Sequence, residues 1–257
     1  MTINRAQLEL IGNGGMAWVY KLKRPGADPV ALKVGRGVDL EFEAMRRIAP
    51  HENVVKEYSQ GAANFCPLLG ELPFLTMEYL EGKDLCAIIW EKGPILEKEA
   101  ARLGLGLISG LKNVWDAGIV HRDLKPENIF LRKEDSDRPV VFDFGIALAQ
   151  NSDGGVLGSP EYVSPEQIKR LELDWRSDQY SLGLLLFFAV SGEIAFDDTK
   201  IIDVLTKKIR FKDAEKIREA KAAANNPFYD MLYKMTMRDR EQRFQTYQEM
   251  LEAFLGV

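Results

Sequence analysis

Residues 119–131 constrain this chain more than any other stretch, because they place a polar loop between an apolar helix and a short apolar run. The loop carries Asp123, Lys125 and Asn128 at fixed offsets, and Pro126 limits the freedom of its backbone. Phosphoryl transfer from a nucleotide requires a carboxylate that accepts a proton, a lysine that neutralises the moving phosphate and an amide oxygen that holds a metal. The alternative interpretation is a solvated loop with a chance pattern.

The composition is that of an ordinary globular protein with a sizeable core. The 257 residues are 46% hydrophobic, and the length alone permits one large domain or two small ones. The net charge of −5 argues against a general surface for nucleic acid or anionic membrane. Cys66 and Cys86 suggest neither a disulfide framework nor a zinc site, which fits a reducing cytoplasm. The longest apolar run, residues 182–190, is too short to span a bilayer, and no basic-then-apolar signal opens the chain, so we expect a soluble protein.

Two predicted strands near the N-terminus enclose a glycine-rich turn. Residues 8–22 alternate apolar and polar side chains on both sides of the glycine-rich run 12–15. Backbone N–H groups of such a turn can approach phosphate oxygens without obstruction, although a plain hairpin turn has the same pattern. The next strand, residues 30–34, places Ala31 and Lys33 on one face, because side chains alternate along a strand. The alternative for Lys33 is a charged edge-strand residue.

The remainder of the chain is predicted to be mainly helical. Helices are predicted for residues 84–91, 97–117, 178–190 (apolar and therefore buried), and near 199–208, 226–237 and 246–255. Among them, residues 140–145 form a predicted apolar strand that ends in Asp143. A buried carboxylate costs free energy unless it is paired, and a bound Mg²⁺ would supply the partner. An N-cap or turn aspartate is the alternative.

Taken in order along nearly the whole chain, these motifs resemble those of the eukaryotic-type serine/threonine protein kinases. The matching motifs are H-R-D-x-K-x-x-N at 121–128, G-x-G-x-x-G-x-V at 12–19 with Ala17 in place of the third glycine, V-A-I-K at 30–33, D-F-G at 143–145 and G-T-x-x-Y-x-A-P-E at 158–166. The Lys125-Pro126-Glu127 run is the serine/threonine form of the loop. The compact loops are typical of bacterial members.

The resemblance implies an α+β, bilobal fold that forms a single catalytic domain over residues 1–257. A small antiparallel-sheet lobe with one helix would cover about residues 1–80. A hinge at 78–83 would lead to a larger, mainly helical lobe over about 84–257. The nucleotide would lie between the two lobes.

The resemblance also assigns roles to individual residues. Asp123 would be the catalytic base, Lys125 would neutralise the moving phosphate, and Lys33 would bind the α- and β-phosphates of ATP. Asn128 and Asp143 would hold Mg²⁺, with Mn²⁺ as an alternative metal. The implied nucleotide site consists of Ile11, Gly12, Asn13, Gly14, Gly15, Met16, Ala17, Val19, Ala31, Lys33, Met77 (the gatekeeper), Glu78 and Leu80 (which would hydrogen-bond adenine), Asp84 (the ribose) and Phe130.

Two glutamates on the predicted helix at 38–49 compete to pair with Lys33. From Glu41, the residues at +3, +4 and +7 are apolar, which places Glu41 on the core-facing stripe. From Glu43, the residues at +3 and +4 are arginines, which mark the solvent face. Glu41 is therefore the predicted partner. The interval from Lys33 to Glu41 is several residues shorter than in most kinases, so the helix is expected to lack its first turns.

Three further roles follow from the resemblance. Asp178 would anchor the backbone of the catalytic loop, and Arg243 would pair with Glu166 in the segment 158–166, which docks the acceptor peptide. Ser152 is the one hydroxyl residue between positions 145 and 158. We expect activity that does not depend on its phosphorylation, with a simple exposed loop residue as the alternative.

Three rival functions have a similar fold, and the third of them is a chain with vestigial activity whose surface recruits a partner. A pseudokinase or ATP-binding scaffold would have lost Lys33, Asp123 or Asp143, and none of them is lost. A small-molecule kinase of the aminoglycoside type shares H-x-D-x-x-x-x-N but lacks a segment like 158–166. We therefore predict a cytoplasmic enzyme that transfers phosphate from ATP to Ser or Thr hydroxyls of proteins, without a nucleic-acid partner or a membrane segment.

Overall fold

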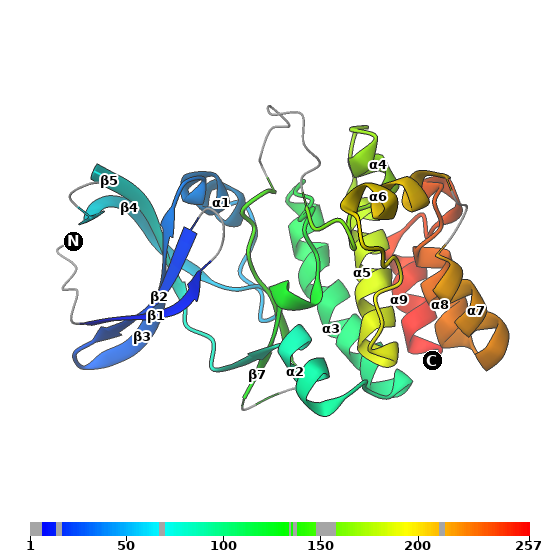
Figure 1. Cartoon of the computed structure of the whole chain (residues 1–257). Coiled ribbons are helices and arrows are strands. Elements are labelled where there is room, and N and C mark those ends of the chain that lie inside the picture. Colours follow the sequence, from blue (N-terminus) through cyan, green and yellow to red (C-terminus); the bar gives the residue numbers. More distant parts are fainter. Residues whose placement is uncertain are drawn as a thin grey trace.

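The computed structural model places an antiparallel sheet at one end of the molecule and a group of helices at the other (Figure 1). It describes residues 7–13, 17–66, 70–133, 135, 138–147, 158–210 and 214–257. The five strands of the sheet pair in the order β1-β2-β3-β5-β4. The elements of this lobe are β1 (Leu8–Asn13), β2 (Ala17–Arg24), β3 (Ala27–Gly35), α1 (Val38–Met45), β4 (Glu57–Cys66) and β5 (Gly70–Glu78). The predicted sheet-based lobe is confirmed.

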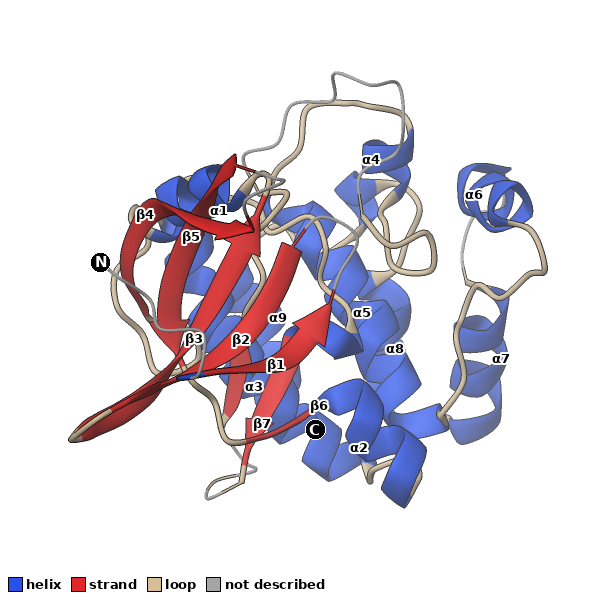
Figure 2. Cartoon of the chain, turned by 60° about the vertical axis from the view of Figure 1, so that its left-hand side comes forward, coloured by secondary structure: helices blue, strands red, loops and turns tan. Residues whose placement is uncertain are grey.

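The second lobe is mainly helical, as predicted. Its helices are α2 (Leu85–Lys92), α3 (Glu97–Asp116), α4 (Pro165–Ile168), α5 (Trp175–Ser191), α6 (Ile201–Arg210), α7 (Glu215–Ala224), α8 (Pro227–Met235) and α9 (Tyr247–Leu255). Short strands β6 (Gly82–Asp84), β7 (Ile129–Arg132) and β8 (Pro139–Val141) form a second sheet, and 3₁₀ turns occupy Pro126–Asn128 and Arg240–Gln242. In the turned view of Figure 2, α5, α7 and α8 lie on the opposite side of the molecule from β4.

Strand β3 has two different faces because its side chains alternate. One face packs in a small apolar cluster that the sheet forms by itself, made of Leu22, Val30, Leu32, Val34 and Phe74. Ala31 belongs instead to the large core that continues into the helical lobe. Lys33 shares the face of Ala31, so the strand directs this lysine away from the sheet's own cluster and toward the space between the lobes.

The turn at residues 51–55 ties the two lobes together. Val55 N donates to Val141 O at 2.9 Å, Val141 N donates to Asn53 O at 2.8 Å, and the Asn53 amide donates to Pro139 O at 2.7 Å. Gly110 on α3 allows this approach, because a Cβ there would lie 2.8 Å from Asn53 Cβ. The helix α3 thus provides the surface on which the sheet lobe docks.

Several helices differ from the sequence-based predictions, among them α4, which was not predicted, and α5, which begins at Trp175 and not at Asp178. α1 ends at Met45 and not at Ala49, and its last turn tightens, with Arg47 N and Ile48 N bonded to carbonyls three residues back. Pro50 disfavours helical geometry at Ala49, which was the predicted last residue of the helix. The helix α7 was not predicted; its pattern is weak, and only Ile217 is buried. No helix in the described part of the chain is long and apolar enough to cross a membrane.

Candidate active site

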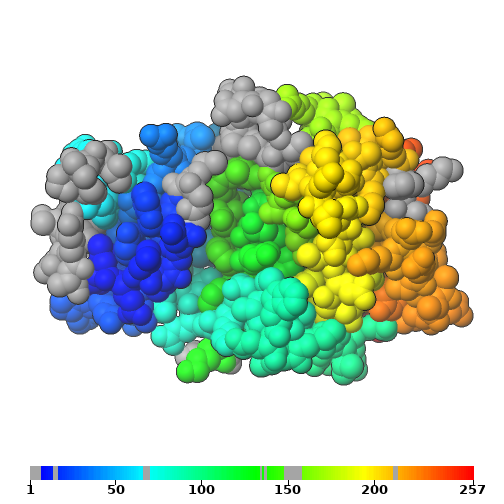
Figure 3. Space-filling model, viewed as in Figure 1, coloured from blue at the N-terminus to red at the C-terminus, as the bar shows by residue number. Residues whose placement is uncertain are grey.

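A cavity of about 780 Å³ lies between the two lobes. Every described member of the predicted nucleotide site lines it, namely Ile11, Gly12, Asn13, Ala17, Val19, Ala31, Lys33, Met77, Glu78, Leu80, Asp84 and Phe130. Gly14, Gly15, Met16 and also Ser152 lie outside the described residues. In Figure 3, the green residues from the middle of the chain are visible between the blue strands of the sheet lobe and the yellow helical residues. The predicted residues, distant in sequence, therefore meet at one concave site.

Lys33 lies between two carboxylates at this cavity. Its Nζ is 2.6 Å from Glu41 Oε2 and 2.8 Å from Asp143 Oδ1. Glu43 is exposed on the other face of α1, so the structure places Glu41, and not Glu43, beside the lysine. Burial disfavours the charge of Lys33, but Glu41 and Asp143 outweigh this effect and raise its pKa. Burial also opposes the charge of Asp143, but Lys33 outweighs it and lowers the pKa of that carboxyl.

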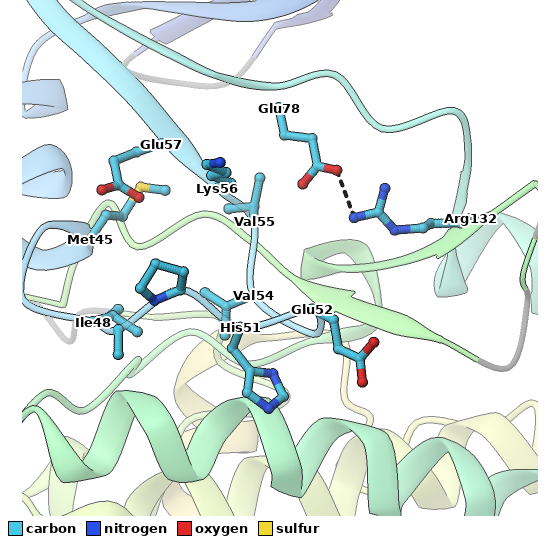
Figure 4. Close-up of a pocket in the computed structure, with 12 residues that line it drawn as sticks. Met45, Ile48, His51, Glu52, Val54, Val55, Lys56, Glu57, Glu78 and Arg132 are labelled. Carbon is cyan, nitrogen blue, oxygen red and sulfur yellow. Dashed lines mark ion pairs between the residues drawn. The ribbon is translucent and has the colours of Figure 1, made fainter.

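The first hinge residue, Glu78, is fixed on the side away from the nucleotide cavity. Its backbone N–H donates to Lys56 O at 2.8 Å, and its Oε1 lies 2.7 Å from Arg132 Nη2 on β7. This ion pair borders a second cavity of about 360 Å³, whose floor includes Val54 and Val55 (Figure 4). The preceding residue of the same strand, Met77, pairs with Ala31 on β3, so the hinge begins beside the face of β3 that carries Ala31 and Lys33. The side chain of Glu78 is thus engaged by Arg132, and its role toward adenine would be a backbone one.

The backbone of the catalytic loop is anchored by Asp178, as predicted. This fully buried carboxylate accepts from His121 N at 2.8 Å, Arg122 N at 2.9 Å and Trp115 Nε1 at 2.9 Å. Arg122 has a φ of 69°, a strained conformation for a non-glycine residue, and the two backbone bonds hold it there. Trp115 was not predicted, because it lies 63 residues before Asp178 in the sequence.

The carboxylate of Asp123 is held by the segment 158–166. Its Oδ1 accepts from Ser159 N at 2.8 Å and from Ser159 Oγ at 2.9 Å. Lys125 Nζ lies 3.4 Å from Asp123 Oδ2 and donates to Ser159 Oγ at 3.0 Å. The amide of Asn128 donates to Asp123 O at 2.8 Å. Lys125 and Asn128 do not line the cavity, whereas Asp123 does.

The segment 158–166 is itself held from several sides. Lys208 on α6 is buried, and its Nζ donates to Glu161 O at 2.6 Å and to Val163 O at 2.9 Å. Ser181 Oγ on α5 donates to Tyr162 O at 2.8 Å. The predicted pair of Arg243 with Glu166 is confirmed, with Arg243 Nη1 2.7 Å from Glu166 Oε1. These contacts hold the segment 158–166 in place where it contacts Asp123.

Several residues at the site were missed by the sequence reasoning. The cavity is also lined by Arg36, Gly37, Val38, Val55, Tyr79, Glu127, Phe142, Gly145 and Ile146. Ser159 was recognised as part of the segment 158–166 but was not assigned to Asp123. For Gly145 and Glu127 the signal was available, because they lie within the D-F-G and H-R-D motifs. For Arg36 the only signal was the short interval between Lys33 and Glu41.

Comparisons with known proteins agree with this geometry. The family model described as "Protein kinase domain" matches residues 5–255. A probable serine/threonine-protein kinase of Clostridium perfringens is 33% identical over 95% of this chain and 37% of its own length. The serine/threonine-protein kinase pkn3 of Myxococcus xanthus is 33% identical over 87% of this chain and 44% of its own length. PrkC, a serine/threonine-protein kinase of Bacillus subtilis, is 32% identical over 95% of this chain and 39% of its own length.

The two lobes and the cavity between them have the bilobal architecture of the protein kinases. The chain belongs to the protein kinase family. Members of this family use ATP and Mg²⁺. The three relatives come from bacteria, in agreement with the expectation from the compact loops. The chain spans about two fifths of the length of these curated relatives.

Proposed function

We propose that this chain transfers the terminal phosphoryl group of ATP to serine or threonine hydroxyls of proteins. The observation that carries the proposal is that Asp123, Lys33 and Asp143 line one cavity of a size that suits a nucleotide. The printed names of the bacterial relatives support the serine/threonine class. No specific observation favours the pseudokinase or the small-molecule alternative.

Asp123 is the proposed base. Its Oδ1 accepts two short bonds from Ser159, whereas Oδ2 accepts only a longer one from Asn128 Nδ2 at 3.3 Å. Oδ2 is therefore the oxygen that would accept the proton of the acceptor hydroxyl. Lys125 lies 3.4 Å from that oxygen and would neutralise the phosphoryl group as it moves between donor and acceptor. The two contacts from Ser159 fix the carboxylate in one orientation, which is the geometric requirement for proton transfer in a defined direction.

The nucleotide would extend from the hinge to Lys33, Glu41 and Asp143. Adenine would lie below Ala31 and Val19, against the backbone of Glu78 and Leu80, with Asp84 at the ribose. Asp84 also caps α2, because its carboxylate accepts from Ala87 N at 2.8 Å. Lys33 would bind the α- and β-phosphates, and Glu41 would hold the lysine in place while the phosphates compete with Asp143 for its ammonium group.

Asn128 and Asp143 fit a hard divalent cation, since Mg²⁺ prefers carboxylate and amide oxygens. The Asn128 amide nitrogen donates to Asp123 O, which leaves the amide oxygen to face elsewhere. The Asp143 side chain is 40% exposed at the cavity, and its lowered pKa keeps it ionised. Asn128 and Asp143 would hold the metal, which would supply positive charge to stabilise the phosphoryl group during transfer.

The segment 158–166 favours a protein acceptor over a small molecule. It is fixed to α5 and α6 through Ser181 and Lys208, and its Ser159 donates a hydrogen bond to the proposed base, Asp123. An acceptor peptide that docks on this segment would therefore bring its hydroxyl to Asp123. We further propose that residues 1–257 form one catalytic domain, with the sheet lobe at about 1–80, the hinge at 78–83 and the helical lobe at about 84–257. Because the reaction consumes ATP, we place it in the cytoplasm.

A phosphate-transfer assay with a generic Ser/Thr acceptor protein tests the function and its metal dependence together. The wild-type protein should transfer labelled phosphate from ATP to serine or threonine, and removal of divalent metal should abolish the transfer. Asp143→Asn should weaken Mg²⁺-ATP binding about tenfold or more, because it removes a charged ligand. Exposed Asp230→Asn is the matched control and should behave as wild type. Absence of transfer by the wild-type protein, or transfer that is independent of metal, would contradict the proposal.

The choice between the two glutamates of α1 gives a separate prediction. Glu41→Gln should lower kcat/KM about 10- to 100-fold. A neutral amide holds Lys33 less firmly, so Lys33 stabilises the transition state less. Glu43→Gln, the same change two residues away on the exposed face, should have little effect. Steady-state kinetics with varied ATP measure both. Equal losses in the two variants, or a larger loss from Glu43→Gln, would refute the assignment.

A further inference from the structure

The link between β3 and α1 places an arginine at the nucleotide cavity. β3 ends at Gly35 and α1 begins at Val38, so Arg36 and Gly37 alone form the link. Gly37 has a φ of 80°, a conformation that favours glycine, and it turns the chain directly into the helix. Both link residues line the cavity. The shortness of the link thus keeps Arg36 at the site and prevents a longer loop from carrying it away.

The order of residues along β3 shows at which end of the cavity Arg36 lies. Ala31 pairs with Met77 at the hinge end of the cavity. Lys33, two residues later on β3, contacts Asp143. Arg36 is three residues beyond Lys33, on the order of 10 Å farther along the strand direction. On the neighbouring strand, Ala17 pairs with Gly35, so Arg36 follows at the point where the glycine-rich turn enters β2. Arg36 therefore lies at the end away from the hinge.

Arg36 also differs in its charge environment from the other cations of the site. Lys33 is paired with Glu41 and Asp143, and Lys125 lies beside Asp123. Arg36 is exposed, and within the described ranges its guanidinium forms no ion pair with a carboxylate. A planar guanidinium with several donors suits phosphate oxygens better than an ammonium group does. The phosphates of a nucleotide could therefore bind Arg36 without displacing a described carboxylate.

We propose that Arg36 binds the terminal phosphate of the nucleotide. The inference rests on the proposed function, because it requires ATP to lie with its base at the hinge. Lys33 then meets the inner phosphates first, and Arg36, farther from the hinge, meets the last one. The link before α1 is short, and α1 lacks its first turns. Because this short link keeps Arg36 at the cavity, it supplies an additional phosphate ligand.

Nucleotide affinities separate this role from a general electrostatic one. In the full chain with Mg²⁺, Arg36→Gln should weaken ATP binding about five- to tenfold, ADP binding less than twofold and AMP binding not at all, measured by displacement of a fluorescent adenine nucleotide. Arg36→Lys should give an intermediate loss for ATP. Arg47→Gln, at an exposed arginine that lines neither cavity, is the matched control and should leave all three affinities unchanged.

Each other outcome would overturn the inference in a recognisable way. Equal weakening of ATP, ADP and AMP would make Arg36 a nonspecific contributor to the potential of the cavity. Unchanged ATP affinity with a raised KM for the acceptor peptide would assign Arg36 to the acceptor instead. Failure of the wild-type protein to bind ATP would overturn the proposed function itself, whereas normal wild-type binding with a silent Arg36→Gln would overturn only the role of Arg36.

Discussion

Asp123→Asn is expected to lower the rate of phosphoryl transfer about a thousandfold, or about 4 kcal/mol in the barrier, with little change in nucleotide affinity. The substitution removes the basic oxygen but keeps the shape of the side chain. The amide oxygen of asparagine can still accept from Ser159 N and Oγ, which now bond Oδ1 at 2.8 and 2.9 Å. The loop should therefore keep its conformation, and the loss should be confined to the chemical step.

Single-turnover transfer and equilibrium ATP binding, measured on the same preparation, check this expectation. Asp116→Asn on the exposed part of α3 is a suitable control, because it makes the same carboxylate-to-amide change away from the cavity. Near-normal turnover of Asp123→Asn would show that the base is another group. A parallel loss of ATP affinity would show that the substitution had disturbed the cavity instead of the chemistry.

The parts of the site that local sequence determines were predictable. The alternation along β3 placed Lys33 on the same face as Ala31, and the apolar residues after Glu41 placed that glutamate on the core-facing side of its helix. In the structure, the two side chains form an ion pair. Both arguments use only the period of a strand or a helix, so they need no knowledge of the rest of the chain. The catalytic loop was recognisable for a similar reason, because Asp123, Lys125 and Asn128 lie within six residues of one another.

Contacts between distant segments were not predictable in the same way. The bond from Ser159 to Asp123 spans 36 residues, and the bond from Trp115 to Asp178 spans 63 residues. No local period fixes such pairs, because they depend on how α3, α5 and the segment 158–166 pack against one another in the folded chain. Arg36 is an intermediate case. The short interval before Glu41 predicted a truncated helix, but only the packed structure shows that the remaining arginine lines the cavity.

The pair of Arg243 and Glu166 is the most deeply buried charged contact that the structure describes in the helical lobe. The two side chains are 0% and 4% exposed, and the guanidinium bonds both carboxylate oxygens, at 2.7 and 3.0 Å. Three backbone carbonyls, those of Met237, Arg176 and Arg238, accept the remaining guanidinium donors. Ser177 Oγ donates to the carboxylate at 2.9 Å. A buried ion pair with all its partners in place is tolerated, but either charge alone is not.

Arg243→Met should therefore destabilise the fold by about 3–5 kcal/mol, because it leaves the Glu166 carboxylate buried with only a serine hydroxyl as a partner. Urea denaturation followed by circular dichroism measures the loss. Arg240→Met is the matched control, because Arg240 begins the 3₁₀ turn that Arg243 directly follows. That side chain is 32% exposed and reaches Asp174 at 3.4 Å, so its removal should cost less than about 1 kcal/mol.

A double variant distinguishes loss of the pair from loss of packing. Arg243→Met combined with Glu166→Met should recover part of the stability, since no buried charge is left without its partner. If Arg243→Met were no more harmful than Arg240→Met, the pair would have no structural role. Because Glu166 ends the segment whose Ser159 holds Asp123, the double variant should still fold but bind the acceptor less well. Its KM for peptide should therefore rise, while its affinity for ATP stays near that of the wild type. This result would link the buried pair to the position of the proposed base, Asp123.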